Sequence, residues 1–407
     1  MTNVWVSVIP LLALILFLIL TIRTFGSDAL SGGSQISLLT ASAVCCAISM
    51  LVYKMKWQLF EDAIKNTLVQ IGSAILILLL IGAISGVWMV SGVVPTLIYY
   101  GMQIIHPHFF LISTCVICCF VSLMTGSSWT TIATIGIALL GIGKAEGFDE
   151  GWIAGAIISG AYFGDKISPL SDTTVLASSM SDTPLFTHIR YMLITTTPSL
   201  IITPVIFLIA GLSHHSGDSG QISLYTGILS ARFKLALWLL LVPVVTVFMI
   251  AKRVPAILVL FLSVAMAGVF ALIFQADILS EIAGSKVTDS ASLFKGFMCS
   301  IYGSTQIVTH HADIDSLLAT RGMAGMLNTV WLILCATCFG ACMTVSGMLR
   351  SITSLLVRFT RSRVGLVSST VTSGLFLNTV VADQYMSIIL SANMFKDSYD
   401  REGYEHR

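Results

Sequence analysis

The sequence predicts an all-α polytopic membrane protein. Of its 407 residues, 56% are hydrophobic and only 10% are charged, a balance far from that of soluble domains. Apolar runs of about 20 residues, the length of a helix that crosses a bilayer, recur along the chain. These runs do not alternate polar and apolar residues as the strands of a membrane barrel do, so helices are expected to be the spanning elements.

Eight apolar runs are expected to cross the membrane. They cover residues 4–22, 36–53, 68–90, 109–125, 189–212, 233–251, 254–274 and 324–345. The first run has no basic leader and no small-residue cleavage site, and it is too long for the apolar region of a signal peptide, so we expect it to be retained as a span. The count stays open, because the segments 109–143 and 293–308 could each cross or re-enter.

Composition and loops exclude several classes of function. The formal net charge is +1 and no basic run is dense, so no nucleic-acid partner is expected. The nine cysteines lie mostly in apolar runs such as CVICC (115–119) and CATCFGAC (335–342), where buried small hydrophobic residues are expected rather than metal or redox sites. The loops are short, so no soluble domain is expected, and their histidines and aspartates are interpreted as solvated.

Two segments suggest an internal duplication. MVSGVVPTLI and TVSGMLRSI each follow a long apolar run, and their serines, Ser91 and Ser346, are 255 residues apart. The same offset brings TGSSWTTIA (125–133) onto VVADQYMSI (380–388). One polar interruption of an apolar run therefore falls on another.

The basic residues of the two copies lie on opposite sides. Lys54, Lys56 and Lys65 flank the long run of the first copy on its N-terminal side, whereas the matching segment 309–320 has no lysine or arginine. Conversely, segment 95–108 has none, and its counterpart carries Arg350, Arg358, Arg361 and Arg363. Since basic residues mark the cytoplasmic side, the swap indicates copies inserted in opposite orientations, which are typical of secondary transporters. The expected repeats are residues 1–230, which include the polar motif 162–179, and the inverted residues 231–407.

The most informative motif is YFGDKISPLSDTTVLASS, residues 162–179. It interrupts an apolar segment of residues 152–180, so Asp165, Lys166 and Asp172 are expected at membrane depth. A charge there costs about 3 kcal/mol even on the lenient insertion scale, and such residues are functional candidates by default.

Oxygen atoms that bind small cations are concentrated in this motif. Pro169 lacks a backbone donor and disfavours helical geometry at Ser168, which predicts an unwound stretch between two half-helices. The carboxylates of Asp165 and Asp172, the freed carbonyls and nearby hydroxyls are hard ligands suited to a cation such as Na⁺. The hydroxyls belong to Ser168, Ser171, Thr173 and Thr174.

A carboxylate that holds either a cation or a proton provides the minimum for exchanging the two. Lys166 is interpreted as a counter-charge that occupies the site when no cation is bound. Two alternatives stay open. Asp172 could be only a helix N-cap, and Lys166 could extend from a membrane interface without a role in binding.

Two further polar breaks fit the same interpretation. TGSSWTT (125–131) suits the tip of a re-entrant hairpin and contributes Ser127 and Ser128, although helix hydroxyls that bond to their own backbone are the alternative. FLNTVVADQYMSI (376–388) places Asn378 and Asp383 in an apolar run, where an aspartate at depth is again a functional candidate.

Three of these segments resemble the hallmark segments of the NhaC-type sodium/proton antiporters, a bacterial family of the ion transporter superfamily. They are GDKISPLSDTT (164–174), MTGSSWTT (124–131) and NTVVADQY (378–385). The resemblance implies an inverted-repeat fold with scaffold and transport regions in the bacterial cytoplasmic membrane. It also implies alternating access, in which outward Na⁺ movement is coupled to inward H⁺ movement. The expected partners of the protein are the lipid bilayer and the transported ions. No cofactor is expected, and whether the protein forms a homodimer is left open.

The chain departs from the family in one place. The repeat offset puts the counterpart of Asp165 at position 420, beyond Arg407, so the second repeat is expected to lack its C-terminal end.

The sequence leaves one alternative function open and argues against two others. The family also contains exchangers of malate for lactate, and half-helix N-termini with hydroxyls in TGSSW and SDTT suit a carboxylate substrate. An intramembrane aspartyl protease needs Gly-x-Gly-Asp, but Tyr162 stands where the first glycine should be. GIGKAEG (141–147) lacks the residues of a phosphate-binding loop. No enzymatic activity is therefore expected.

Overall fold

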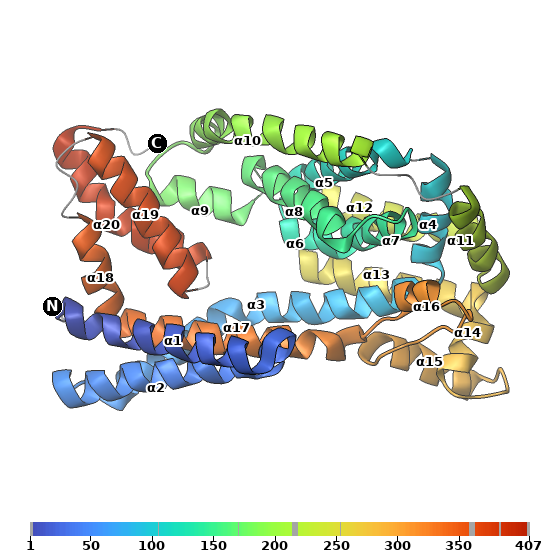
Figure 1. Cartoon of the computed structure of the whole chain (residues 1–407), viewed down its shortest axis with the longest axis horizontal. Helices are drawn as coiled ribbons and strands as arrows, with labels where there is room; N and C mark the ends of the chain where they lie inside the picture. The colour runs from blue at the N-terminus through green and yellow to red at the C-terminus, as the bar shows by residue number, and fades with distance from the viewer. Residues whose placement is uncertain are drawn as a thin grey trace. The chain divides into compact units, whose positions relative to one another are not determined.

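A computed structural model describes residues 3–104, 106–169, 171–213, 219–252, 254–357, 363–381 and 384–404. This part of the chain is helical, with one isolated β-bridge between Thr305 and Thr320 (Figure 1). It forms two compact units. The first unit comprises Met1–Ile75, Leu176–Pro184 and Leu327–Arg407, and the second comprises Leu76–Val175 and Leu185–Met326.

The helices follow in chain order within each unit. The first unit contains α1 (Val4–Phe25), η1 (Gly26–Ser31), α2 (Gly33–Tyr53), α18 (Met348–Val357), α19 (Arg363–Val381) and α20 (Gln384–Glu402). The second contains α4 (Val93–Ile104), η2 (Pro107–Phe109), α5 (Phe110–Thr125), α6 (Ser128–Thr131), the π-helical turn η3 (Ile132–Gly136), α7 (Ile137–Ala145), α8 (Glu150–Ile167), α10 (Leu185–Ser213), α11 (Ser219–Arg232), η4 (Leu237–Leu240), α12 (Leu241–Ala251), α13 (Ala256–Phe274), α14 (Ala276–Ile282), α15 (Ser290–Tyr302) and α16 (Ala312–Leu318). Three helices have residues in both units: α3 (Trp57–Val90), α9 (Asp172–Met180) and α17 (Gly322–Val345).

The all-α membrane architecture is confirmed. Eight helices in the described part of the chain are long and apolar enough to cross a membrane, and seven of them coincide with expected runs. The eighth is Ser128–Ala145, part of a segment whose crossing the sequence left open. The expected run 233–251 is different, because Leu224–Arg232 and Leu237–Ile250 form a pair bent by 94°.

The first unit packs α1 against α2 and α18, and α19 against both α18 and α20. A hydroxyl pair, Thr21 and Ser37, joins α1 to α2 at 3.0 Å. The apolar core of this unit includes Phe60, Phe339 and Met343, none of which is exposed to solvent. Six of the nine cysteines are buried and the other three are half-buried, so the expectation of buried cysteines holds for six of them.

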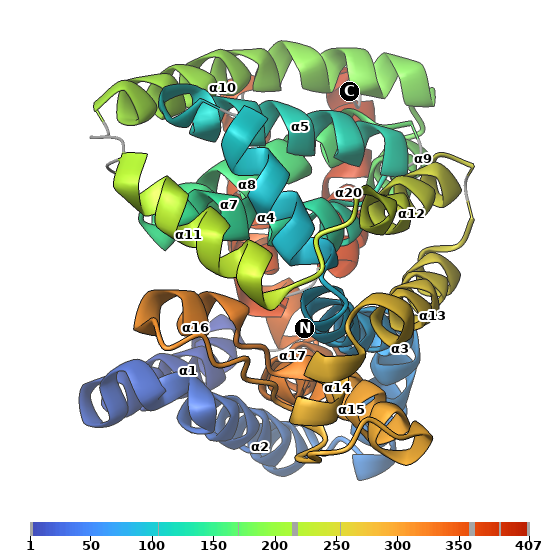
Figure 2. The same cartoon turned by 90° about the vertical axis from the view of Figure 1, so that its right-hand side faces the viewer.

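In the second unit, α5 and α8 pack against each other more extensively than any other two helices, and α10 packs against both of them (Figure 2). α7 packs against α4 and α8, α12 packs against α13, and α14 packs against α15. Deep in this unit the indole Nε1 of Trp88 donates to Ser263 Oγ at 3.0 Å, and Thr246 Oγ1 donates to the same oxygen at 3.0 Å. These bonds satisfy polar groups that would be costly to bury alone.

Local sequence explains where α8 begins. Asp149 is its N-cap and accepts a hydrogen bond from Gly151 N at 2.8 Å. Glu150 adds a negative charge to the first turn, which interacts favourably with the helix dipole. The start of α8 is thereby fixed, and its other end carries the polar motif.

Candidate functional site

The expected break in the polar motif is present. α8 ends at Ile167 and α9 begins at Asp172. Between them, Ser168 N donates to the Asp165 carbonyl at 3.1 Å, and Ser171 N donates to the Ser168 carbonyl at 3.2 Å. Pro169 stands between these two bonds, where its missing donor and its effect on Ser168 interrupt the helix.

A second break faces the first one. α5 ends at Thr125, Gly126 has φ +66°, and the next helical stretch begins at Ser128. Ser127 is the N-cap, since its Oγ accepts from Thr130 N at 3.2 Å and from Thr130 Oγ1 at 3.0 Å. The helix that starts here continues through the π-helical turn to Ala145.

Asp165 and Ser128 join the two breaks. The hydroxyl of Ser128, which is 2% exposed, donates to Asp165 Oδ2 at 2.9 Å. Asp165 is half-buried in the last turn of α8. A carboxylate at the first turn of a helix is stabilised by the positive end of that helix dipole. The structure therefore brings together two of the residues expected at the site, which lie 37 positions apart in the chain.

Close packing of α5 against α8 makes this meeting possible. A Cβ on Gly160 would overlap the Cys115 carbonyl, and one on Gly164 would overlap the Cys119 carbonyl. The Gly-x-x-x-Gly spacing thus lets the two backbones touch, as in membrane helix pairs. Ser122 Oγ donates to the Ala161 carbonyl at 2.5 Å, which adds a polar tie to the same interface.

The hydroxyls after the α8 break are also organised. Ser168 Oγ donates to the Leu123 carbonyl at 2.8 Å, so the break after α8 is tied to the end of α5. Ser171 Oγ and Thr173 Oγ1 are 3.0 Å apart. Thr174 Oγ1 donates to the Lys166 carbonyl at 3.0 Å. One carbonyl that the sequence suggested as a ligand is therefore already bonded to a hydroxyl.

The other expected site residues are placed as follows. Lys166 is exposed on α8, and among the described side chains no carboxylate lies within ion-pair distance of its ammonium. Asp172 begins α9, but its side chain lies outside the described part of the structure. Asn378 is exposed on α19 in the first unit, and Asp383 lies outside the described residues.

Sequence reasoning missed Ser122 and the glycine pair as parts of the site. The signal for the glycines was present in GWIAGAIISGAYFGD, where Gly160 and Gly164 are one turn apart before Asp165. Ser122 gave no such signal, because its partner is a backbone carbonyl of another helix.

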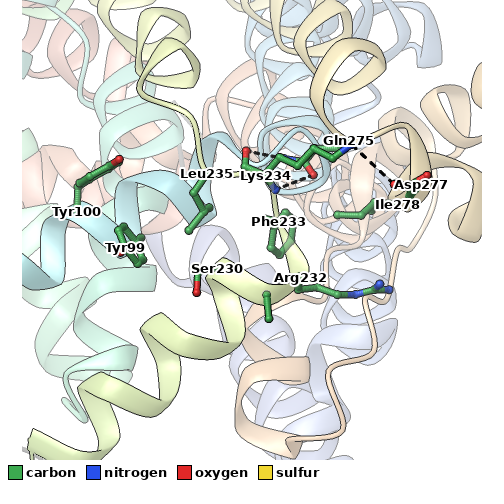
Figure 3. A pocket seen from close by; sticks show the side chains of 11 residues that line it. Tyr99, Tyr100, Ser230, Arg232, Phe233, Lys234, Leu235, Gln275, Asp277 and Ile278 are labelled. Carbon is green, nitrogen blue, oxygen red and sulfur yellow. Dashed lines mark hydrogen bonds and ion pairs between the residues drawn. The ribbon is translucent and has the colours of Figure 1, made fainter.

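A polar pocket of about 530 Å³ was also missed. It lies in the second unit between α4, the end of α11, the linker 233–236 and the start of α14 (Figure 3). Two cations two positions apart, Arg232 and Lys234, line it. They stand at the edge of an apolar run, which was the available signal.

Among the carboxylates outside the candidate spans, Glu146 and Asp315 have pKa values shifted in opposite directions. Glu146 directly follows α7 and is 1% exposed. Burial raises the pKa of Glu146 to about 7, because lost hydration disfavours the ionised form. The pKa of Asp315 is lowered, since Thr309 Oγ1 and Thr309 N both donate to its Oδ1 at 2.6 Å.

Comparisons with known proteins agree on one family. The profile of the Na⁺/H⁺ antiporter family matches residues 160–407. The chain is 36% identical over 363 residues to the Na⁺/H⁺ antiporter NhaC of Alkalihalophilus pseudofirmus, covering 88% of this chain and 75% of that protein. It is 33% identical over 370 residues to the Na⁺/H⁺ antiporter NhaC of Bacillus subtilis, covering 90% and 78%.

A relative of different name is equally similar. The chain is 35% identical over 337 residues to the malate-2H⁺/Na⁺-lactate antiporter of Bacillus subtilis, covering 82% of this chain and 69% of that protein.

Proposed function

The chain belongs to the Na⁺/H⁺ antiporter family, and we propose on this premise that it exchanges Na⁺ for H⁺ across the bacterial cytoplasmic membrane by alternating access. The family consists of transporters, and the apolar helices of this chain suit a multi-pass protein. Transported Na⁺ and H⁺ are the ligands that exchange requires, and no cofactor or enzymatic step is proposed.

The observation that carries the proposal is the hydrogen bond from Ser128 to Asp165 where two interrupted helices meet. A carboxylate with hydroxyls around it provides the hard oxygen ligands that Na⁺ prefers. We assign Asp165 and Asp172 as the groups that hold Na⁺ or H⁺. The hydroxyls of Ser127, Ser128, Ser168, Ser171 and Thr173 complete the proposed set.

Exchange follows from competition for one carboxylate. When Asp165 is ionised, its oxygens attract Na⁺, and the Ser128 hydroxyl donates to them. When Asp165 is protonated, its charge is neutralised and the Coulomb attraction for Na⁺ is lost. The Ser128 oxygen can then accept, because a hydroxyl both donates and accepts. Binding of one ion to Asp165 therefore excludes the other. Lys166 would balance the negative charge of the carboxylate after one ion has left and before the other has bound.

Helix boundaries support the proposed duplication. α3 ends at Val90 and α17 at Val345, while α4 begins at Val93 and α18 at Met348, both at an offset of 255 residues. At these two breaks the glycines Gly92 and Gly347 have φ of +83° and +72°. The pattern supports repeats in residues 1–230 and 231–407. The opposite orientation of the second repeat, and the contributions of Asn378 and Asp383 to the site, remain proposals based on charges and motifs.

The test is proton flux in everted vesicles that contain the full chain. Addition of NaCl alone is expected to release protons from wild-type vesicles, and the Asp165→Asn variant is expected to lose this response. Asp62→Asn changes an exposed aspartate on α3 and serves as the matched control. Sodium-dependent flux that persists in Asp165→Asn would overturn the assignment of the site.

A second candidate is coupled exchange of small carboxylates, favoured by the relative named for malate and lactate. The first turn of the helix that begins at Ser128 and the hydroxyls near it would suit a carboxylate group. In the same vesicles, flux that appears only with malate and lactate would replace sodium/proton exchange with this candidate.

A further inference from the structure

The pocket near Arg232 and Lys234 combines features that the proposed exchange does not use. One wall is formed by Tyr99 and Tyr100 of α4, whose rings pack edge to face with centroids 5.1 Å apart. The opposite wall is the linker after α11 and the start of α14 (Figure 3). The pocket holds about 530 Å³, which is room for a polyatomic group rather than a single dehydrated cation.

Helix ends place this pocket at the level of the membrane surface. The candidate span α13 ends at Phe274, and the lining residue Gln275 follows directly. The chain bends by 94° between α11 and the η4–α12 segment, at the same linker. Gln275 joins the two places, since Lys234 N donates to its Oε1 at 3.3 Å and its Nε2 donates to the Lys234 carbonyl at 3.2 Å. Basic and tyrosine side chains at span ends are typical of the headgroup region.

Both cations keep donors that their acidic partners do not use. Lys234 Nζ lies 3.9 Å from Asp277 Oδ2, which is too long for a hydrogen bond, and the Lys234 side chain is 67% exposed. Arg232 pairs with Glu281 through one terminal nitrogen. Its Nε is buried and has no hydrogen-bond partner among the described residues. A buried Nε is not accessible to a ligand, so the donors that the pocket presents are the Lys234 ammonium and the terminal nitrogens of Arg232, whose side chain is 31% exposed.

The surface beside the pocket is apolar and exposed. Leu237 and Trp238 of η4 directly follow the linker and are 64% and 71% exposed. Tryptophan at this level is typical of residues that contact the boundary between headgroups and acyl chains. An anionic group in the pocket would thus have space for attached acyl chains along η4.

We propose that this pocket binds the phosphate headgroup of an anionic phospholipid, with Lys234 and Arg232 as its cationic ligands. Bound there, the lipid phosphate would bridge the α11–η4 bend. It would compete with Asp277 for the Lys234 ammonium, so the two acidic residues limit its affinity. The site is separate from the Ser128–Asp165 pair in residues and in ligand chemistry, so the proposal does not rest on which ion is transported.

The test is native mass spectrometry of the full chain in detergent with added phosphatidylglycerol or phosphatidylcholine. Wild type is expected to retain phosphatidylglycerol in preference to phosphatidylcholine. Lys234→Gln should weaken phosphatidylglycerol retention about fivefold, the effect of one basic residue at a membrane surface. Asp277→Asn should strengthen it, because the competing carboxylate is removed. Both side chains are largely exposed, at 67% and 79%, so folding should be preserved.

Lys252→Gln is the matched control, since Lys252 is exposed at the opposite end of α12 and should retain wild-type lipid binding. Equal retention by wild type, Lys234→Gln and Asp277→Asn would overturn the proposal. A separate arm adds glycerol phosphate or malate without lipid. Tight binding of either free anion, lost in Lys234→Gln while lipid retention is unchanged, would assign the pocket to a soluble anion and would also overturn it.

Discussion

At the level of single residues, Asp165 and Ser128 make contributions that can be separated. The carboxylate supplies charge, whereas the hydroxyl supplies a hydrogen bond of 2.9 Å and an oxygen ligand. Loss of the carboxylate should abolish exchange, while loss of the hydroxyl should only weaken it.

Ser128→Ala is therefore expected to retain exchange but to raise the Na⁺ concentration for half-maximal flux at least about tenfold, since a hydrogen bond to a charged group contributes about 1.5–3 kcal/mol. The measurement is sodium-dependent proton flux over a range of NaCl concentrations. Ser280→Ala removes a hydroxyl that donates only to the Ala276 carbonyl one turn earlier and serves as the control. An unchanged half-maximal concentration in Ser128→Ala would remove Ser128 from the site.

Glu146 should make stability depend on pH. Its folded-state pKa is raised to about 7 by burial, whereas an unfolded glutamate has its ordinary pKa near 4.3. Stability from the neutral form is full below the unfolded value and is lost as pH rises toward the folded value. Glu146→Gln cannot ionise, so the excess of its Tm over that of wild type should grow from about pH 5 to about pH 7 and then level off toward pH 8.

The measurement is thermal unfolding in detergent across that pH range. Glu402→Gln changes an exposed glutamate on α20 and should give no such trend. A Tm difference between Glu146→Gln and wild type that stays constant with pH would contradict the burial of an ionisable Glu146.

At the level of helices, the site depends on how closely α5 approaches α8. A methyl group on Gly160 would overlap the Cys115 carbonyl, whereas one on Gly155 of the same helix would meet only Phe207 at 3.9 Å. Gly160→Ala is therefore expected to destabilise the protein by about 1–3 kcal/mol, the usual cost of overpacking. Gly155→Ala should be neutral or slightly stabilising, because alanine favours helix over glycine.

The two variants differ by the same single methyl group, and their Tm values in detergent can be compared directly. Exchange should fall in Gly160→Ala, since displacement of α8 separates Asp165 from Ser128. Equal Tm values and equal exchange in the two variants would show that the close approach has no role.

The sequence predicted the breaks at Pro169 and Gly126 because local chemistry causes both of them. Proline removes a backbone donor and glycine accepts φ +66°, independent of distant contacts. The bend between α11 and η4 lies at the start of the expected run 233–251 and was not predicted. At this bend Gln275 forms hydrogen bonds with the backbone of Lys234, 41 residues away in the chain. A partner so distant in sequence cannot be predicted from the local residue pattern.

At the level of the whole molecule, composition and hydropathy were sufficient for the class. Seven expected runs became spanning helices because a length of about 20 apolar residues is itself the physical requirement. The hydrogen bond between Ser128 and Asp165, in contrast, could not be predicted from composition and hydropathy. The sequence marked both residues as polar in apolar surroundings, but their meeting depends on the glycine contacts between α5 and α8.

The proposed duplication also belongs to this scale. α5 ends at Thr125 and α19 at Val381, an offset of 256 residues that is close to the 255 between the ends of α3 and α17. If the copies act together, the segment around Asp383 contributes oxygen ligands of its own. Asp383→Asn is then expected to reduce sodium-dependent flux while leaving membrane insertion intact, measured as flux per inserted protein. Full flux in this variant would restrict the site to the first repeat.

The most direct test of the central claim is uptake of radioactive sodium into proteoliposomes that contain the purified chain and an imposed pH gradient, with no organic acid present. The account predicts that sodium accumulates as the proton gradient is dissipated, and that Asp165→Asn abolishes this uptake while Asp62→Asn preserves it. Sodium uptake that is absent in wild type, or that is unchanged in Asp165→Asn, would contradict exchange of Na⁺ and H⁺ at Asp165.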